Sequence, residues 1–503
     1  MKRGIKNYKY KIPPPRSAET LLRELADCKV TTSPLFPDAS MKRVLAEVSD
    51  FRVIKENIKR QVYYLETPEG GYFLKRSILI RAKDQVRHFF LPQRRWAEWH
   101  NFHRLHAARI AVSSPVLRAE NIDRYPKIFF LLTKEVNGTP LPSNLFLISK
   151  KLGQYLAFLH SCGVYHADLH PENILIQPDN EFCLIDVQEV YLLPWMPRWL
   201  RVYNLGKLFF HLRLSMDSRH WIKRFIEGYN RESITTVTVS DLFKAADRHQ
   251  QRHYRSRAKR CCKNSTEFVI VNRSGMRGFK RRKFNWGWHE LKKALIKGKT
   301  IKPGRILAFE SVCIKIHRKN FFHQDRCLAS WKMSRVLEVR NIQVPRSLAY
   351  FVLEGNSYFL SEYLNGGILL NDYLSSLTNW QQKRRALKKL ASWVKKIHIH
   401  NIWQRDFKTT NILYQNGEYF MVDLEGVKIR QLSNINKTTN LAQLNASISN
   451  VISLKDRLRF FYYYSADANL SRKQRRDVYQ KVWDITKKKN VGSFGLDMTK
   501  LEP

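Results

Sequence analysis

Alternating apolar and polar positions predict a small antiparallel sheet in the first half of the chain. The segments QVYYLE (61–66) and GYFLKRS (71–77) have strand character, and the turn-forming tetrapeptide TPEG joins them, which predicts a hairpin. A helical pattern with aromatic and charged residues follows in RRWAEWHNFHRL (94–105), and KIFFLLTKEV (127–136) is again typical of a strand.

Further along the chain, the pattern predicts an apolar helix and a second, shorter hairpin. The helix is expected in LGQYLAFLH (152–160), and the hairpin in ILIQ and EFCLID on either side of the turn PDN (178–180). We therefore expect an α+β fold, with a five-stranded sheet lobe followed by a mainly helical lobe.

The second half of the chain repeats this order of elements. The segment LGQYLAFLHSCGVYHADLHPENILI aligns without gaps with LASWVKKIHIHNIWQRDFKTTNILY, and FCLIDV matches YFMVDL. The matched polar pairs are His160 and His398, Asp168 and Asp406, Asn173 and Asn411, and Asp186 and Asp423. The two aspartates are 18 residues apart in the first copy and 17 in the second.

The repeat predicts two tandem domains. We expect an N-terminal extension over residues 1–45, a first domain over 46–245 and a second over 246–503. The boundary is placed beside RESITTVTVS (231–240), because this segment is polar and β-branched and a very basic segment follows it. In the second copy, Asn416-Gly417 predicts a two-residue turn in the last hairpin.

Composition narrows the class of protein. The chain of 503 residues has 89 Lys and Arg against 43 acidic residues, a net charge of +46 that favours polyanionic partners. A hydrophobic content of 44% with 12% aromatic residues excludes a disordered basic tail. Seven cysteines without a CxxC pair support neither a disulfide framework nor a zinc site. Without a long apolar run or a secretory signal, we expect a soluble, cytosolic protein with reduced cysteines.

Five residues of the first copy have the order that phosphoryl transfer from ATP requires. This chemistry needs a cation on the phosphates, metal ions between them and an aspartate beside the attacking hydroxyl. Lys75 lies in a predicted strand, and Glu98 lies in the next predicted helix, where it can pair with that lysine. Asp168 and Asn173 are five residues apart in one predicted loop, where the aspartate can act as a base and the asparagine as a metal ligand. Asp186 ends the next strand and can chelate magnesium.

HADLHPENILI followed by LIDV resembles the catalytic set of the protein-kinase-like superfamily. Longer similarity, in RSRAKRCCKNSTEF (255–268), WQRDFKTTNILY, MVDLEGV and the stretch TNLAQLNASIS to LRFFYYY, resembles the bacterial lipopolysaccharide core kinase family, which phosphorylates Kdo or heptose sugars. The resemblance implies two tandem protein-kinase-like domains, each with a small antiparallel-sheet N-lobe and a mainly helical C-lobe.

The resemblance also implies the role of each site residue. Asp168 and Asp406 would orient and deprotonate the acceptor hydroxyl. The remaining roles would be Mg2+ binding by Asn173 with Asp186 and by Asn411 with Asp423, and ATP binding by Lys75 with Glu98 and by Lys315.

Several departures from the family pattern stand out. Neither copy has a GxGxxG loop, so KENIKR (55–60) would have to cover the phosphates in the first. In the second copy Gln404 replaces the His, and Ser330 falls opposite Glu98. We therefore expect Lys315 to lack a carboxylate partner on the helix that follows its strand. The sequence leaves open whether the second domain is active.

The leading hypothesis is an ATP- and Mg2+-dependent kinase of a lipopolysaccharide inner-core sugar. It would act at the cytoplasmic face of the bacterial inner membrane on the core glycolipid. The stretch 248–302, with 18 Lys and Arg, would contact the anionic membrane surface or the glycolipid, and no specific nucleic acid is expected. The alternatives are a small-molecule phosphotransferase of aminoglycoside- or choline-kinase type and a non-catalytic tandem pseudokinase scaffold. The sequence leaves the acceptor sugar and the oligomeric state open.

Overall fold

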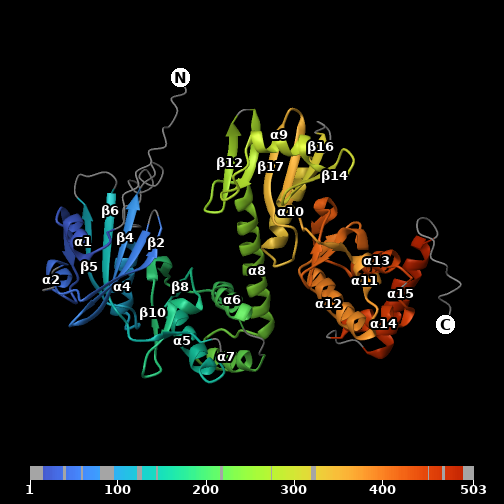
Figure 1. Cartoon of the computed structure of the whole chain (residues 1–503). Helices are drawn as coiled ribbons and strands as arrows, with labels where there is room; N and C mark the ends of the chain where they lie inside the picture. Colours follow the sequence, from blue (N-terminus) through green and yellow to red (C-terminus); the bar gives the residue numbers. More distant parts are fainter. Residues whose placement is uncertain are drawn as a thin grey trace. The chain divides into compact units, whose positions relative to one another are not determined.

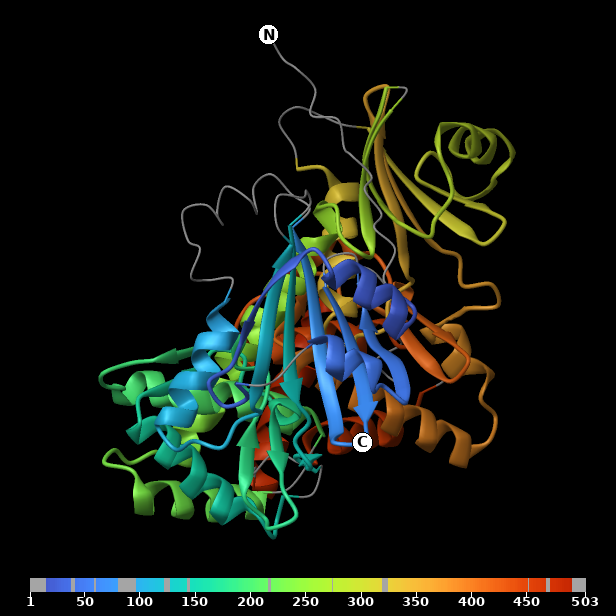
Figure 2. The same cartoon turned by 90° about the vertical axis from the view of Figure 1, so that its left-hand side faces the viewer.

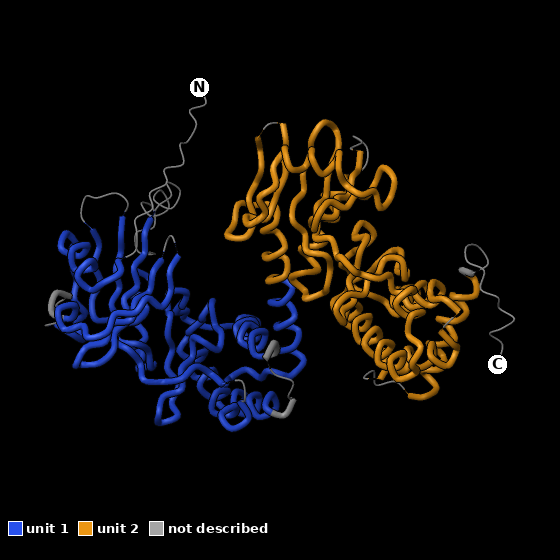
Figure 3. The backbone as a smooth tube through the Cα atoms, viewed as in Figure 1, with its two compact units in different colours: residues 1–251 blue, residues 252–503 orange. Residues whose placement is uncertain are grey.

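The computed structural model describes residues 15–37, 41–57, 60–79, 96–121, 127–142, 145–215, 219–273, 275–318, 324–450, 452–466 and 471–490. The chain forms two compact units, residues 1–251 and 252–503 (Figure 3). Each unit contains one large antiparallel sheet and a mainly helical part (Figure 1). The α+β class predicted from the sequence is therefore confirmed.

The sheet of the first unit has six strands in the order β1-β5-β6-β4-β3-β2. The strands are β1 (Cys28–Thr32), β2 (Asp50–Glu56), β3 (Arg60–Thr67), β4 (Gly70–Leu79), β5 (Pro115–Asn121) and β6 (Lys127–Lys134). The predicted hairpin is confirmed as β3 and β4, which pair antiparallel with Val62 opposite Lys75. Because β6 pairs with the other side of β4, Lys75 lies on an interior strand that is held from both sides.

The two faces of this sheet have different neighbours (Figures 1 and 2). Helices α1 (Ala18–Leu25) and α2 (Met41–Ala46) pack their leucines on one face, against residues such as Tyr63. Helix α4 (Ala97–Ala107) packs Trp99 and Phe102 with the core of the helical part.

Part of the N-terminal stretch that was predicted as an extension belongs to this sheet. Strand β1 pairs with β5, with Val30 opposite Ala119, and its backbone groups satisfy the edge that β5 would otherwise leave open. This pairing gives six strands, where the sequence had predicted five.

The helical part of the first unit surrounds a large apolar core. Its helices are α5 (Ser149–Ser161), α6 (Arg198–Ser215), α7 (Arg219–Glu232) and α8 (Val239–Ala258). Its short strands and 3-10 turns are β7 (Thr139–Pro140), β8 (Val164–His166), η2 (Pro171–Asn173), β9 (Ile174–Ile176), β10 (Phe182–Leu184), η3 (Val187–Glu189) and β11 (Val190–Leu192). Strands β9 and β10 form the second predicted hairpin.

The second unit has a seven-stranded sheet in the order β12-β13-β17-β18-β16-β15-β14. The strands are β12 (Phe268–Arg273), β13 (Met276–Arg281), β14 (Lys299–Lys302), β15 (Ile306–Phe309), β16 (Val312–Arg318), β17 (Ser347–Leu353) and β18 (Asn356–Glu362). Helix α9 (Trp288–Lys297) packs on one face, and α10 (Arg326–Glu338), which carries Trp331, packs on the other. The 3-10 turn η4 (Lys259–Cys262) precedes β12.

A second helical core completes this unit. Its elements are β19 (Ile368–Leu369), α11 (Leu370–Ser376), α12 (Trp380–Ile399), β20 (Ile402–Gln404), η5 (Thr409–Asn411), β21 (Ile412–Gln415), β22 (Glu418–Met421), η6 (Leu424–Gly426), β23 (Val427–Ile429), α13 (Asn434–Ser447), α14 (Leu454–Ser465) and α15 (Arg472–Asn490). The predicted turn Asn416-Gly417 joins β21 and β22, and both residues have positive φ, as a two-residue hairpin turn requires.

The segment that the sequence suggested as a domain boundary connects the end of α7 to the start of a long helix, α8. The hydroxyl of Thr238 accepts a hydrogen bond from the amide of Asp241, and the carboxylate of Asp241 accepts one from the amide of Thr238. This reciprocal cap begins α8, so the polar residues there start a helix. The division between the two units, at residues 251 and 252, falls within this helix.

In the part of the chain that the structure describes, no helix combines the length and the apolar character needed to cross a bilayer.

Gly153 provides a test of how α5 and α7 pack. A Cβ atom at Gly153 would lie 2.2 Å from the carbonyl oxygen of Phe225 and 2.8 Å from the amide nitrogen of Tyr229. Both atoms belong to the backbone and cannot rotate away. We expect Gly153→Ala to lower the free energy of unfolding by about 1–3 kcal/mol, although alanine is the better helix former. Denaturant unfolding of the full chain measures this change, and an increase in stability would contradict the close packing.

Candidate active site

In the first unit, the ammonium group of Lys75 lies between two carboxylates from different elements. Lys75 Nζ forms a short ion pair with Glu98 on α4 and lies 3.3 Å from Oδ1 of Asp186. Arg60, at the start of β3, approaches the same carboxylates, at 3.7 Å from Glu98 and 3.6 Å from Asp186. The predicted group of Lys75, Glu98 and Asp186 is thus brought together at the sheet.

Asp186 reaches this position through a strained backbone. It has φ 54° and ψ 54°, the left-handed region that non-glycine residues seldom adopt but that aspartate tolerates better than most. The next turn is held by Asn101 on α4, whose side-chain amide donates to the carbonyl oxygens of Val187 and Val190, each at 2.8 Å. These contacts keep the Asp186 carboxylate beside α4 and Lys75.

Asp168 lies in a loop directly after β8. The backbone amide of Asp168 donates to Nδ1 of His166 at 3.2 Å, and Lys207 Nζ donates to Oδ1 of Asp168 at 2.7 Å. Asn204 on α6 donates to the carbonyl oxygen of His166 at 2.7 Å. His166 therefore supports the loop through its buried ring and its backbone.

Asn173 connects the Asp168 loop with the strand that leads to Asp186. Its side-chain amide donates to the carbonyl oxygen of Asp168 at 2.9 Å. The backbone carbonyl oxygen of Asn173 accepts a hydrogen bond from the backbone amide of Ile185, the residue before Asp186, at 3.0 Å. Asp168, Asn173 and Asp186 therefore form one hydrogen-bonded framework.

The charges of the site keep both aspartates ionised. Burial by itself raises the pKa of Asp168, but the hydrogen bond and charge of Lys207 outweigh it and leave the pKa below its ordinary value. For Asp186, burial likewise raises the pKa, but the charges of Lys75 and Arg60 outweigh it and leave the pKa below its ordinary value. Burial lowers the pKa of His166 to about 4, so its ring is neutral at pH 7.

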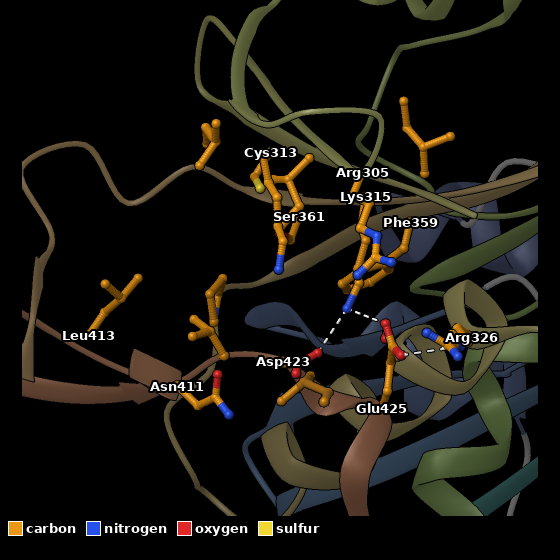
Figure 4. Close-up of a pocket in the computed structure, with 18 of the residues that line it drawn as sticks. Arg305, Cys313, Lys315, Arg326, Phe359, Ser361, Asn411, Leu413, Asp423 and Glu425 are labelled. Atoms are coloured by element: carbon orange, nitrogen blue, oxygen red, sulfur yellow. Dashed lines mark hydrogen bonds and ion pairs between the residues drawn. The ribbon is translucent and has the colours of Figure 1, made fainter. Parts of the chain in front are cut away.

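Three matching residues of the second unit, but not Asp406, line a cavity of about 1000 Å³ (Figure 4). Lys315, Asn411 and Asp423 all line it, with Lys315 Nζ at 2.9 Å from Oδ1 of Asp423. Asp423 has the same left-handed backbone as Asp186, with φ 56° and ψ 66°. Asn411 donates to the carbonyl oxygen of Asp406 at 2.9 Å. The cavity has the size of a small-molecule site.

The sequence interpretation missed Glu425. As expected, Ser330 on α10 offers no carboxylate, but Lys315 forms a short ion pair with Glu425 in η6 (Figure 4). The signal in the sequence was the acidic residue of MVDLEGV, two positions after Asp423, where the first copy has Gln188. The expectation that Lys315 lacks a helix partner is correct, but the lysine has gained a partner from another element.

Gln404 replaces the loop histidine and forms different hydrogen bonds. The side-chain amide of Gln404 donates to the backbone carbonyl oxygen of Asp423 at 3.1 Å. The backbone carbonyl oxygen of Gln404 accepts from the side-chain amide of Asn440 at 2.7 Å. Asn440 therefore supports the second loop as Asn204 supports the first. The carboxylate of Asp406 pairs with Lys408 at 3.0 Å.

Two further sequence expectations are refined. In the predicted loop KENIKR, residues 58 and 59 lie outside the described part of the chain, and Arg60 is the residue that approaches the site. Within the basic stretch, Arg281 is buried and pairs with Glu267 and Glu338, so this residue has a structural role.

Comparison with known proteins gives weak structural similarities. An acyl-carrier-protein complex of WaaP is 17% identical with a TM-score of 0.31, and it covers 44% of this chain and 97% of its own. An aminoglycoside-3'-phosphotransferase of type VIII is 16% identical (TM-score 0.29; 39% and 91% covered). The spectinomycin phosphotransferase APH(9)-Ia, with ADP and spectinomycin, is 12% identical (TM-score 0.29; 44% and 88%). Similarities of this size do not assign a function. No curated protein sequence matches the chain.

A family model matches a segment in each unit. It matches residues 146–229 in the first unit and 312–464 in the second, and these segments include both aspartate–asparagine loops. The family is described as that of lipopolysaccharide kinases, so the match supports a phosphotransferase. The matched segments make up a little under half of the chain, and the match to the lipopolysaccharide kinase (Kdo/WaaP) family agrees with the resemblance found in the sequence motifs.

Proposed function

We propose that the protein is an ATP- and Mg2+-dependent kinase that phosphorylates a sugar hydroxyl, of Kdo or heptose, in the lipopolysaccharide inner core. The family match supports the class of enzyme. The observation that carries the proposal for the first unit is the convergence of Lys75 with Glu98 and Asp186, next to the loop of Asp168 and Asn173.

The chemistry of the donor atoms fits magnesium and nucleotide phosphate. The Asn173 amide nitrogen donates to Asp168, which leaves the amide oxygen for a cation, and the Asp186 side chain is 42% exposed. In the described residues no group of three or more His, Cys, Asp or Glu could hold a metal ion. Mg2+ commonly uses one or two protein carboxylates with phosphate and water oxygens, so Asn173 and Asp186 would suffice.

Asp168 has the properties of the residue that orients the acceptor. Its Oδ1 is held by Lys207, whereas among the described residues Oδ2 has only His170 Nε2 at 3.7 Å. Because the side chain is 52% exposed, Oδ2 can accept the proton of a sugar hydroxyl. Lys75, held by Glu98, would contact the phosphates. Bound Mg2+–ATP supplies the phosphoryl group and neutralises its charge. The protein residues then supply alignment and a fixed positive charge.

Two features support a sugar acceptor: the net charge of the chain and the short segment that follows the proposed metal-binding aspartate in each copy. In each copy 17 or 18 residues separate that aspartate from Asn204 or Asn440, without an Ala-Pro-Glu anchor for a peptide substrate. A short segment favours a small or sugar acceptor. The net charge of +46 favours the phosphorylated core glycolipid and an anionic cytoplasmic membrane face.

Replacement of the two loop aspartates tests the proposed chemistry. We expect the double variant Asp168→Asn with Asp406→Asn to lower kcat by about 10²–10⁴-fold, because proton transfer from the hydroxyl is lost. The two single variants assign the turnover to a unit. Phosphate transfer from labelled ATP to purified core glycolipid measures the rate. The control is Asp179→Asn with Glu418→Gln, at an exposed and a partly exposed position of the two hairpins, both away from the site residues. A double variant with the normal rate would contradict the proposed role.

Lys207 provides a pH test of the same site. Lys207→Gln removes the charge and hydrogen bond that lower the pKa of Asp168, so that pKa rises. Activity requires the ionised carboxylate and is lost as pH falls through its pKa. We therefore expect the acid limb of kcat/KM to move to higher pH in the variant, measured between about pH 4 and about pH 9 with Asp406→Asn in both proteins. Lys151→Gln, at an exposed ion pair with Glu181, is the control. An unmoved acid limb would exclude Asp168 as the titrating group.

Deletion of the gene tests the acceptor. We expect core oligosaccharide from the deletion strain to lack a phosphate group in mass spectra. The wild-type gene should restore the phosphate, and the Asp168→Asn, Asp406→Asn gene should not. Unchanged core phosphate, with transfer to aminoglycosides or choline in vitro, would favour the small-molecule phosphotransferase. Unchanged phosphate without any transfer would favour the scaffold.

A further inference from the structure

The lysine of each unit has two carboxylate partners, but the units draw these partners from different elements. In the first unit, Glu98 comes from helix α4 and Asp186 from the loop after β10. In the second, Asp423 and Glu425 come from one short segment that leads into η6 (Figure 4). Each lysine therefore has two carboxylate partners.

Helix α10 carries Ser330 at the position that corresponds to Glu98 on α4. Ser330 and Glu98 each directly precede a buried tryptophan on the helix that follows the lysine strand. Ser330 is 1% exposed, lines the cavity, and its hydroxyl has no hydrogen-bond partner among the described residues. A serine side chain here is too short to hold the lysine. Among the described residues, the only ionic contact between α10 and the cluster of Lys315, Asp423 and Glu425 is that of Arg326, whose Nε lies 3.7 Å from Glu425 Oε2.

The position two residues after the aspartate differs in the opposite sense: it is neutral in the first unit and acidic in the second. Gln188, two residues after Asp186, is neutral, and its side-chain oxygen accepts from Arg60 at 3.0 Å. Glu425, two residues after Asp423, is ionic and its side chain is only 17% exposed. The first unit thus has Glu on the helix and Gln in the loop, whereas the second has Ser on the helix and Glu in the loop.

We propose that Glu425 is the positioning residue for Lys315 and that the second unit is therefore a functional nucleotide-phosphate site, in addition to that of the first unit. The proposal rests on the proposed kinase function and extends it to the second unit. Glu425 holds the Lys315 ammonium group at the wall of the cavity, next to Asp423 and on the same lining as Asn411.

Removal of Glu425 has a defined electrostatic consequence. Burial lowers the pKa of Lys315, but Asp423 and Glu425 outweigh it and leave the pKa above its ordinary value. Without Glu425, Lys315 keeps Asp423 as its remaining carboxylate partner in the described structure. The lysine then competes directly with a cation for the carboxylate that the site needs, and its position is less well fixed.

Labelling with an acyl phosphate of ATP tests the proposal in the full chain. This probe acylates a lysine amine that lies beside the bound phosphates, and mass spectrometry reads Lys75 and Lys315 on separate peptides. We expect both lysines to be labelled in the wild-type protein and protected by excess Mg2+–ATP. Glu425→Gln should reduce labelling of Lys315 about ten- to hundredfold and leave Lys75 unchanged.

A second substitution separates positioning from folding. Ser330→Glu added to Glu425→Gln places a carboxylate on the helix, as in the first unit, and should restore most of the Lys315 labelling. A carboxylate on another element would not repair η6 if Glu425 only stabilised the fold. The charge-matched control is Glu418→Gln, whose surface partner is Lys389. Thermal unfolding checks that each variant is folded.

The apo protein gives a readout that does not depend on nucleotide. Competitive labelling with acetic anhydride across a pH series reports the pKa of each lysine, because only the neutral amine reacts. We expect Glu425→Gln to lower the pKa of Lys315 and the added Ser330→Glu to raise it again. An unchanged pKa would show that the ion pair does not hold the lysine.

The outcomes distinguish the two levels of the proposal. Labelling of Lys75 alone in the wild-type protein would overturn the second site and leave the kinase proposal intact. Unchanged Lys315 labelling in folded Glu425→Gln, or failure of Ser330→Glu to restore it, would overturn the role of Glu425. If neither lysine were labelled, the kinase proposal itself would fail, and the second nucleotide site with it.

Discussion

The contact on which each site depends is the ion pair between a strand lysine and an aspartate from the helical part. Lys75 pairs with Asp186 and Lys315 with Asp423, in both cases in a partly buried position. At a few ångströms and reduced dielectric, such a pair is much stronger than on an open surface. It joins the large sheet to the hairpin segment and places the lysine beside the carboxylate, as the proposed kinase function requires.

Two features hold the aspartate partner in place. The left-handed backbone at Asp186 and Asp423 turns the chain sharply between a buried strand and a 3-10 turn. Side-chain amides then fix the neighbouring backbone, from Asn101 in the first unit and Gln404 in the second. Backbone strain of this kind persists only where surrounding contacts determine it, which is typical of functional sites.

The two units meet one electrostatic requirement with different residues. In the proposed site, a lysine with a single carboxylate partner would neutralise the carboxylate that is to bind the metal, and a second carboxylate would relieve this competition. The second carboxylate is Glu98 in one unit and Glu425 in the other. Substitution at the helix position therefore does not by itself indicate an inactive unit, because the charge can be supplied from a turn that packs against the same lysine.

Local patterns in the sequence determined much of the fold and the membership of the site. The hairpin of β3 and β4, the Asn416-Gly417 turn, helix α5 and the aspartate–asparagine loops were all readable, because each depends on residues close together in the chain. Only the tertiary structure decided that β1 joins the edge of the first sheet and that Glu425 replaces the missing helix glutamate. Both depend on contacts between residues about 90 to 110 positions apart, which no local propensity encodes.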